Sequence, residues 1–85
     1  MSKMEESINE AISSIRSDIE EIKASDNQHM AAINKWNSLE KNYRYLQIAN
    51  KEYKKATTEY EEAKKLIATL DKDFVEKFNQ TVENN

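Results

Sequence analysis

The chain has 85 residues, of which 34% are charged and 38% hydrophobic, and its formal net charge is -3. It contains no glycine, proline or cysteine, so disulfides, thiolate metal sites and glycine-rich phosphate loops are excluded. Strand-rich folds use glycine and proline for hairpins and tight turns. The composition therefore predicts an all-α protein, and its length predicts a single domain over residues 1–85.

No targeting or membrane segment stands out. No apolar run approaches the roughly 18 residues that span a bilayer, and the first residues, MSKMEES, lack the apolar core of a secretory signal. A soluble, cytoplasmic protein is therefore expected. The abundance of lysine, asparagine and isoleucine suits a phage or AT-rich bacterial accessory protein.

A first helix is predicted over residues 3–24. Ser2 and Glu5 have the spacing of a capping box at its start. Five isoleucines follow at alternating spacings of four and three, the heptad pattern of a coiled coil: Ile8, Ile12, Ile15, Ile19 and Ile22. Isoleucine at both core positions favours trimers or tetramers, and the same stripe also suits packing inside a helical hairpin.

The isoleucine pattern stops at residues 25–28. If it continued, Asp26 and His29 would enter the core, so a short connection is predicted here, with a continuous or kinked helix as the alternative. His29 itself is expected to be exposed or to cap a helix.

A long second helix is predicted over residues 29–80, with Thr69 and Asp71 favouring a break near residues 69–73. The expected fold is a coiled-coil-like helical hairpin of one short and one long helix, assembled into an oligomeric bundle.

Charge supports this hairpin. Residues 1–22 carry two basic and six acidic side chains, whereas residues 41–55 carry five basic side chains and one acidic. Reversal near residues 25–28 would pair the acidic segment with the basic one. The hairpin core would then combine the five isoleucines with Ile33, Trp36, Leu39 and Tyr43.

Beyond the hairpin, the second helix carries an apolar stripe without an intramolecular cover. Large and small residues alternate along it as far as Ile67, and its members are Leu46, Ala49, Tyr53, Ala56, Tyr60, Ala63, Ile67, Leu70 and Phe74. An exposed stripe of this length is unstable in water, and a second copy of the chain is the simplest cover. The stripe therefore predicts a homo-oligomer.

Two further surfaces are of interest. A basic segment contains Lys41, Arg44, Lys51, Lys54 and Lys55, which together form a candidate face for an anionic partner. Tyr45 and Ile48 lie off the main apolar stripe and are the best candidates for a secondary contact surface.

The inventory predicts no catalytic residues, no cofactor and no metal site, since a single histidine and no cysteine are present. The expected function is protein–protein interaction, as a small coiled-coil scaffold, adaptor or inhibitor that binds itself and another protein. The alternative is a nucleic-acid-binding accessory factor that uses the basic segment. Membrane-surface binding by the same lysines and open, filament-like assembly are further alternatives.

Overall fold

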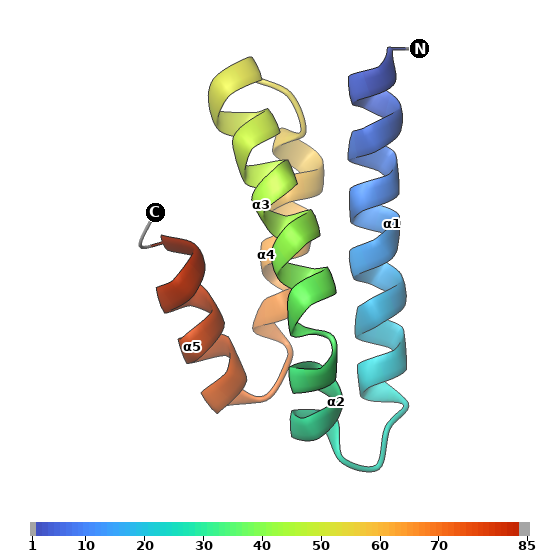
Figure 1. Ribbon diagram of the computed structural model, residues 1–85, viewed down its shortest axis with the longest axis vertical. Coiled ribbons are helices and arrows are strands. Elements are labelled where there is room, and N and C mark those ends of the chain that lie inside the picture. Colours follow the sequence, from blue (N-terminus) through green and yellow to red (C-terminus); the bar gives the residue numbers. More distant parts are fainter. Residues whose placement is uncertain (1, 84–85) are drawn as a thin grey trace.

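The computed structural model describes residues 2–83 of the chain, and over these residues it contains helices and no strand (Figure 1). Five helices follow one another: α1 (Lys3–Lys23), α2 (Gln28–Asn34), α3 (Trp36–Tyr53), α4 (Thr57–Ala68) and α5 (Lys72–Glu83). The prediction of an all-α protein is confirmed. No helix in this part of the chain is both long and apolar enough to cross a membrane.

The first helix forms as the local pattern predicts. Ser2 caps α1, its hydroxyl oxygen accepting a hydrogen bond from the Glu5 N–H at 3.1 Å. All five isoleucines are at most 4% exposed, so they form one buried face. The helix ends at Lys23, and the Asn27 side chain caps α2 by accepting from the Met30 N–H at 3.1 Å.

The predicted long helix over residues 29–80 is wrong. The chain leaves the helical conformation at Lys35, at residues 54–56 and at residues 69–71, the last of these within the break predicted near residues 69–73. A continuous helix of the predicted length would measure about 78 Å at 1.5 Å per residue. The longest extent of the molecule is 39 Å, and α1, with 21 residues, is longer than α3, with 18.

Tertiary packing, rather than the local sequence, explains the turn between α3 and α4. Lys54 (φ 58°) and Ala56 (φ 66°) are both left-handed, which costs about 1–2 kcal/mol each for residues other than glycine. The turn is closed by the Lys55 N–H, which donates to the Ala49 carbonyl at 3.0 Å. Reversal buries side chains such as Ile67, each worth about 1.5–3 kcal/mol. Burial therefore outweighs the local preference for a continuous helix.

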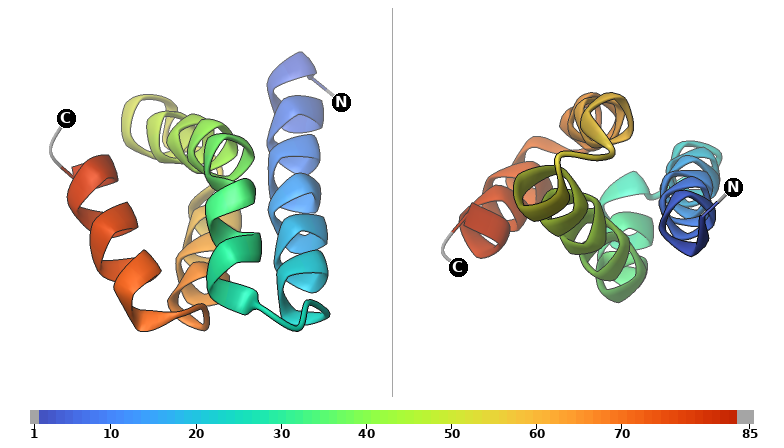
Figure 2. Two further views of the ribbon diagram at one scale, coloured as in Figure 1. Left: turned by 60° about the horizontal axis from the view of Figure 1, so that its bottom comes forward. Right: turned by 90° about the horizontal axis from the view of Figure 1, so that it is seen from above.

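The predicted self-association stripe lies mostly inside the chain. Ala56 and Tyr60 are partly buried, whereas Tyr53 is 56% exposed. The remaining members are each at most 7% exposed: Leu46, Ala49, Ala63, Ile67, Leu70 and Phe74. Helices α1, α3 and α4 each contact the other two and cover much of this stripe (Figure 2). Self-association stays a prediction, but covering this stripe is no longer a reason for it.

Helix α5 closes over an aromatic cluster. The Trp36 ring lies edge-on to the rings of Phe74 and Phe78, with centroids 5.1 and 5.3 Å away, and Tyr43 lies edge-on to Phe78 at 5.5 Å. Phe74, Phe78 and Val82, spaced four residues apart, are at most 2% exposed. These three side chains attach α5 to the rest of the molecule.

Most of the predicted hairpin core is buried, but Ile33 is not. Leu39 and Tyr43 are buried together with the five isoleucines, and Trp36 is partly buried. Ile33 is 46% exposed, so its assignment to the core is wrong; Ala32, at 0%, faces inward instead. The break at Lys35 reorients α2 relative to α3, which a continuous heptad pattern cannot describe.

Candidate functional site

The two flanks of the α1–α3 pair differ. On one flank, α4 packs against both helices, and Arg16 of α1 donates two hydrogen bonds to the Glu62 carboxylate of α4, at 2.6 and 2.7 Å. On the other flank, no helix of residues 2–83 covers the pair (Figure 2, right). A groove of about 800 Å³ lies between α1 and α3. It is lined by Ser7, Glu10, Ala11 and Ser14 from α1 and by Asn37, Ser38, Lys41, Asn42, Arg44, Tyr45 and Ile48 from α3.

Apart from Glu10, the side chains of the α1 wall of this groove are small. Ser7, Ala11 and Ser14 recur at spacings of four and three, so they lie on one side of α1. On the α3 wall, Tyr45 is partly buried and Ile48 is 49% exposed. Serines and an alanine opposite a tyrosine and an isoleucine leave room for an incoming helix to approach closely.

A hydrogen bond and an ion pair join the two sides of the groove near Asp18. The Ser38 hydroxyl of α3 donates to Asp18 Oδ2 of α1 at 2.7 Å, and Lys35 Nζ lies 3.8 Å from Asp18 Oδ1. Asp18 is 7% exposed, so these contacts compensate a buried carboxylate. Lys35 also pairs with Glu21, and that hydrogen bond raises the pKa of Lys35. Two polar bridges thus fix the spacing of the helices.

Ile48 stands between two hollows. It lines the α1–α3 groove on one side and, on the other, a hollow of about 340 Å³ between α3 and α5. We call Arg44, Tyr45, Ile48, Lys51 and Glu52, which share this exposed side of α3, the α3 ridge. Charges of both signs surround Ile48 in equal number: Lys41, Arg44 and Lys51 against Glu10, Glu52 and Glu83.

Arg44 is held in place by its neighbours. Its Nε donates to Glu40 Oε2 at 2.8 Å, and its terminal nitrogen donates to the Thr81 carbonyl of α5 at 3.1 Å. The other Glu40 oxygen accepts from the Trp36 indole N–H at 2.6 Å. The hydrogen bond from Arg44, followed by that from Trp36, lowers the pKa of Glu40. The guanidinium is therefore a positioned charge at the edge of the ridge.

The structure divides the predicted basic segment. Lys41, Arg44 and Lys51 lie along one side of α3 and line the two hollows beside Ile48. Lys54 and Lys55 lie in the turn after α3, and Lys55 lines a different, smaller hollow together with Glu5 and Glu59. The five basic residues thus do not line one hollow, and acidic side chains lie among them.

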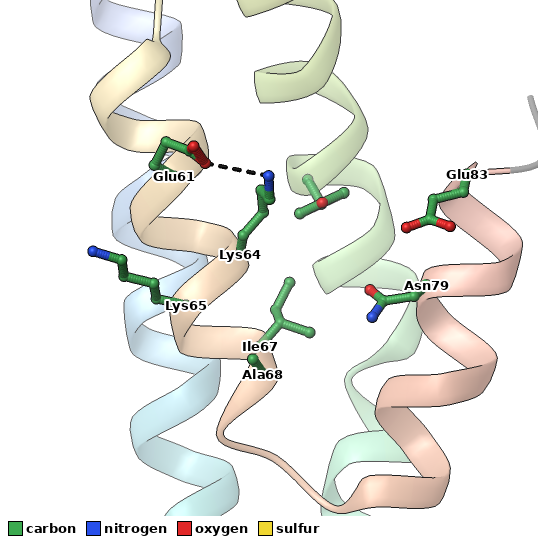
Figure 3. A pocket seen from close by; sticks show the side chains of 8 residues that line it. Glu61, Lys64, Lys65, Ile67, Ala68, Asn79 and Glu83 are labelled. Carbon is green, nitrogen blue, oxygen red and sulfur yellow. Dashed lines mark ion pairs between the residues drawn. The ribbon is translucent and has the colours of Figure 1, made fainter.

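A separate pocket of about 520 Å³ lies between α4 and α5 (Figure 3). Tyr43 and Ile67 line it; the Tyr43 hydroxyl donates to the Tyr60 hydroxyl at 3.3 Å. Burial, and next this hydrogen bond, raise the pKa of Tyr43. Lys64 Nζ lies 5.2 Å from the Tyr60 ring centroid and 3.2 Å from Glu61 Oε2, so its charge is already compensated. The Asn79 and Glu83 side chains of α5 point into the pocket toward α4 (Figure 3), so its lining is amphipathic.

His29 has a structural partner. Its Nδ1 lies 2.6 Å from Asp71 Oδ2, which links α2 to the start of α5. The same carboxylate oxygen accepts from the Phe74 N–H at 3.2 Å. The hydrogen bond with His29 is the largest of the effects that lower the pKa of Asp71, and the Phe74 N–H is the next. Sequence reasoning missed this pair because its members lie 42 residues apart.

The α1 wall of the groove was also missed. Tyr45 and Ile48 were singled out because they depart from the apolar stripe, and the structure places both in the groove. Ser7, Ala11 and Ser14 carry no such signal, since small residues on a helix acquire meaning only once the neighbouring helix is known.

No group of three or more histidine, aspartate or glutamate side chains within residues 2–83 is arranged to hold a metal ion. The chain matches no protein-family model, no curated protein and no solved structure.

Proposed function

We propose that the chain is a non-enzymatic protein-interaction module, a scaffold, adaptor or inhibitor, whose contact surface is the α1–α3 groove. The observation that carries this proposal is the unequal coverage of the α1–α3 pair. One flank is filled by α4, whereas the other retains Ile48 at 49% exposure beside the partly buried Tyr45.

The groove suits a helix as its occupant. Its α3 wall runs from Asn37 to Ile48, about 18 Å at 1.5 Å per residue, which is the length of about three helical turns. A partner helix seated there would mirror α4 and complete a four-helix arrangement around α1 and α3. It would present an apolar residue every three or four positions to Tyr45 and Ile48, with polar side chains facing the serines and asparagines.

The chemistry of the groove favours binding over catalysis. His29, the only histidine in the sequence, is bonded to Asp71 between α2 and α5 and does not line the groove. The Ser38 hydroxyl donates to the Asp18 carboxylate, a contact that joins α3 to α1.

Nucleic-acid binding is the second candidate, and one observation favours it. Lys41, Arg44 and Lys51 follow one side of α3 with Tyr45 between them, which combines phosphate-binding cations with a stacking ring. The equal number of carboxylates around the same hollows weighs against it, because they repel a polyanion.

A matched pair of isoleucines tests the proposal. Ile48 and Ile33 are 49% and 46% exposed, so glutamate at either position should leave the fold intact. Proteins captured from the source cells by the tagged chain are identified by mass spectrometry, and binding of each purified partner is then measured. Ile48→Glu should abolish binding, whereas Ile33→Glu should retain it.

Equal binding by both variants would contradict the groove as the contact surface. Fluorescence anisotropy with labelled single- and double-stranded oligonucleotides tests the second candidate. Tight binding that weakens steeply with salt and is lost on Lys51→Glu would favour nucleic acid over protein.

A further inference from the structure

The α3 ridge has a pattern that is complementary to itself. Arg44 lies four residues before Ile48 and Glu52 four residues after it; Tyr45 lies three before and Lys51 three after. Residues three and four positions from Ile48 share its side of the helix. On one exposed helix side, the ridge thus carries a cation and an aromatic ring before the apolar centre, and a cation and an anion after it.

We propose that a second copy of this chain packs against the α3 ridge at the Ile48 end of the groove, in a twofold pair whose α3 helices run antiparallel and cross at Ile48. This inference rests on the proposed function and names its partner. A twofold axis through Ile48 places each residue before it opposite the residue equally far after it in the partner. Arg44 then faces the partner's Glu52, and Tyr45 faces the partner's Lys51. Both contacts occur twice, because a twofold interface repeats every contact.

Charge selects this arrangement over its competitors. A parallel pairing would place Arg44 opposite the partner's Arg44 and Lys51 opposite the partner's Lys51. A polyanion would meet three carboxylates among the six charged side chains that surround Ile48. The antiparallel pair instead sets Arg44 opposite a carboxylate, and it sets the ammonium of Lys51 opposite the Tyr45 ring, a pairing that favours a cation–π contact.

The surface is also prepared for such a contact. Glu40 and the Thr81 carbonyl already hold Arg44, so little side-chain freedom is lost when the partner's Glu52 becomes its second carboxylate. Ile48 projects between two hollows, and on the proposed axis it meets the partner's Ile48. The small side chains Ser7 and Ala11 leave space in the α1–α3 groove beside it.

The first test uses a single cysteine on the proposed axis. The sequence contains no cysteine, so Ile48→Cys introduces the only thiol, and the twofold pair brings it next to the same thiol of the partner. Under mild oxidation, Ile48→Cys should form a disulfide-linked dimer, whereas Ile33→Cys, at a position of similar exposure, should react far more slowly. Equal rates of dimer formation for the two variants would overturn the proposal.

The second test measures the dimer without a new covalent bond. Sedimentation equilibrium of the full chain at low salt should show a reversible monomer–dimer equilibrium. Glu52→Lys should weaken it at least about tenfold, since two attractive pairs become repulsive. Glu76→Lys makes the same charge change at an exposed position of α5 and should leave the equilibrium unchanged.

Failure of this inference can be separated from failure of the proposed function. A chain that stays monomeric at all concentrations, while Ile48→Glu still abolishes binding to another captured protein, overturns the second copy as occupant and leaves the groove as the contact surface. Dimer formation that Ile48→Glu and Glu52→Lys leave unchanged places the interface elsewhere and overturns the twofold pair.

Discussion

Replacing Lys54 with glycine tests the turn that converts a predicted long helix into α3 and α4. Lys54 is exposed and left-handed, with φ 58° and ψ 35°. The left-handed conformation costs a residue with a Cβ atom about 1–2 kcal/mol, and glycine removes this cost. Glycine also has more conformational freedom in the unfolded chain, which offsets about 0.4–1 kcal/mol of that stabilisation. The net expectation is a stabilisation of about 0.5–1 kcal/mol.

The assay is equilibrium unfolding in urea, followed by far-UV circular dichroism. Lys54→Gly should raise the midpoint without changing the slope, and it should raise Tm by about 2–8 °C for a domain of this size. The matched control is Lys41→Gly, an exposed lysine inside α3, where glycine should destabilise by about 0.5–1 kcal/mol. If Lys54→Gly lowers the midpoint as Lys41→Gly does, residue 54 lies within a helix and the turn is refuted.

Three further substitutions test the packing and the polar contacts. Phe78→Ala should cost about 3–5 kcal/mol in urea unfolding, because Phe78 is fully buried in the aromatic cluster; a loss below about 1 kcal/mol would mean that α5 is not docked. Ser38→Ala should cost about 1–3 kcal/mol, since it removes a hydrogen bond from the buried Asp18 carboxylate, and an unchanged midpoint would contradict that bond. The pKa of Asp71 is lowered in the folded state, so the stability from its bond to His29 is present above the unfolded value of about 3.9 and is lost as the pH falls through the folded pKa. His29→Ala should therefore destabilise at pH 5–6 and much less near pH 2, and an equal loss at both pH values would contradict this assignment.

The predictable parts of the fold are those in which local signals agree. The five isoleucines of α1 repeat at helical spacing, and Ser2 caps the same helix just before them. The helix and its buried face therefore follow from residues that are close together in the chain. The connection after Lys23 follows from polar residues at positions that the apolar stripe would otherwise fill.

The α3–α4 turn could not be predicted in this way, because its cause is not local. Lys54 and Ala56 adopt a conformation that their side chains disfavour, and the sequence around them has no glycine or proline to mark a break. The turn exists because reversal buries Ala63 and Ile67 against helices that precede it in the chain. An apolar stripe shows which residues are buried, but not whether its own chain or another one buries them.

The same distinction explains which part of the candidate site was predictable. Tyr45 and Ile48 are apolar and lie off the stripe, so a single helix is enough to mark them as unexplained. The groove also needs the wall with Ser7 and Ala11, and its position depends on the antiparallel packing of α1 and α3, which Ser38 and Asp18 fix. A surface formed by two helices cannot be read from the pattern of either one.

Internal coverage of the apolar stripe also changes how the chain is expected to associate. A stripe such as Leu46 to Phe74, if left exposed, would make folding depend on a partner, and association would be strong and permanent. The chain itself buries most of these residues. The groove then offers only Ile48, Tyr45 and a balanced set of charges, a small surface of the kind that supports weak, reversible contacts. Folding and binding then rest on different residues. Substitution of Ile48 should leave the urea midpoint of the monomer unchanged while it removes association, whereas Phe78→Ala should lower the midpoint and affect association only through the loss of folded protein.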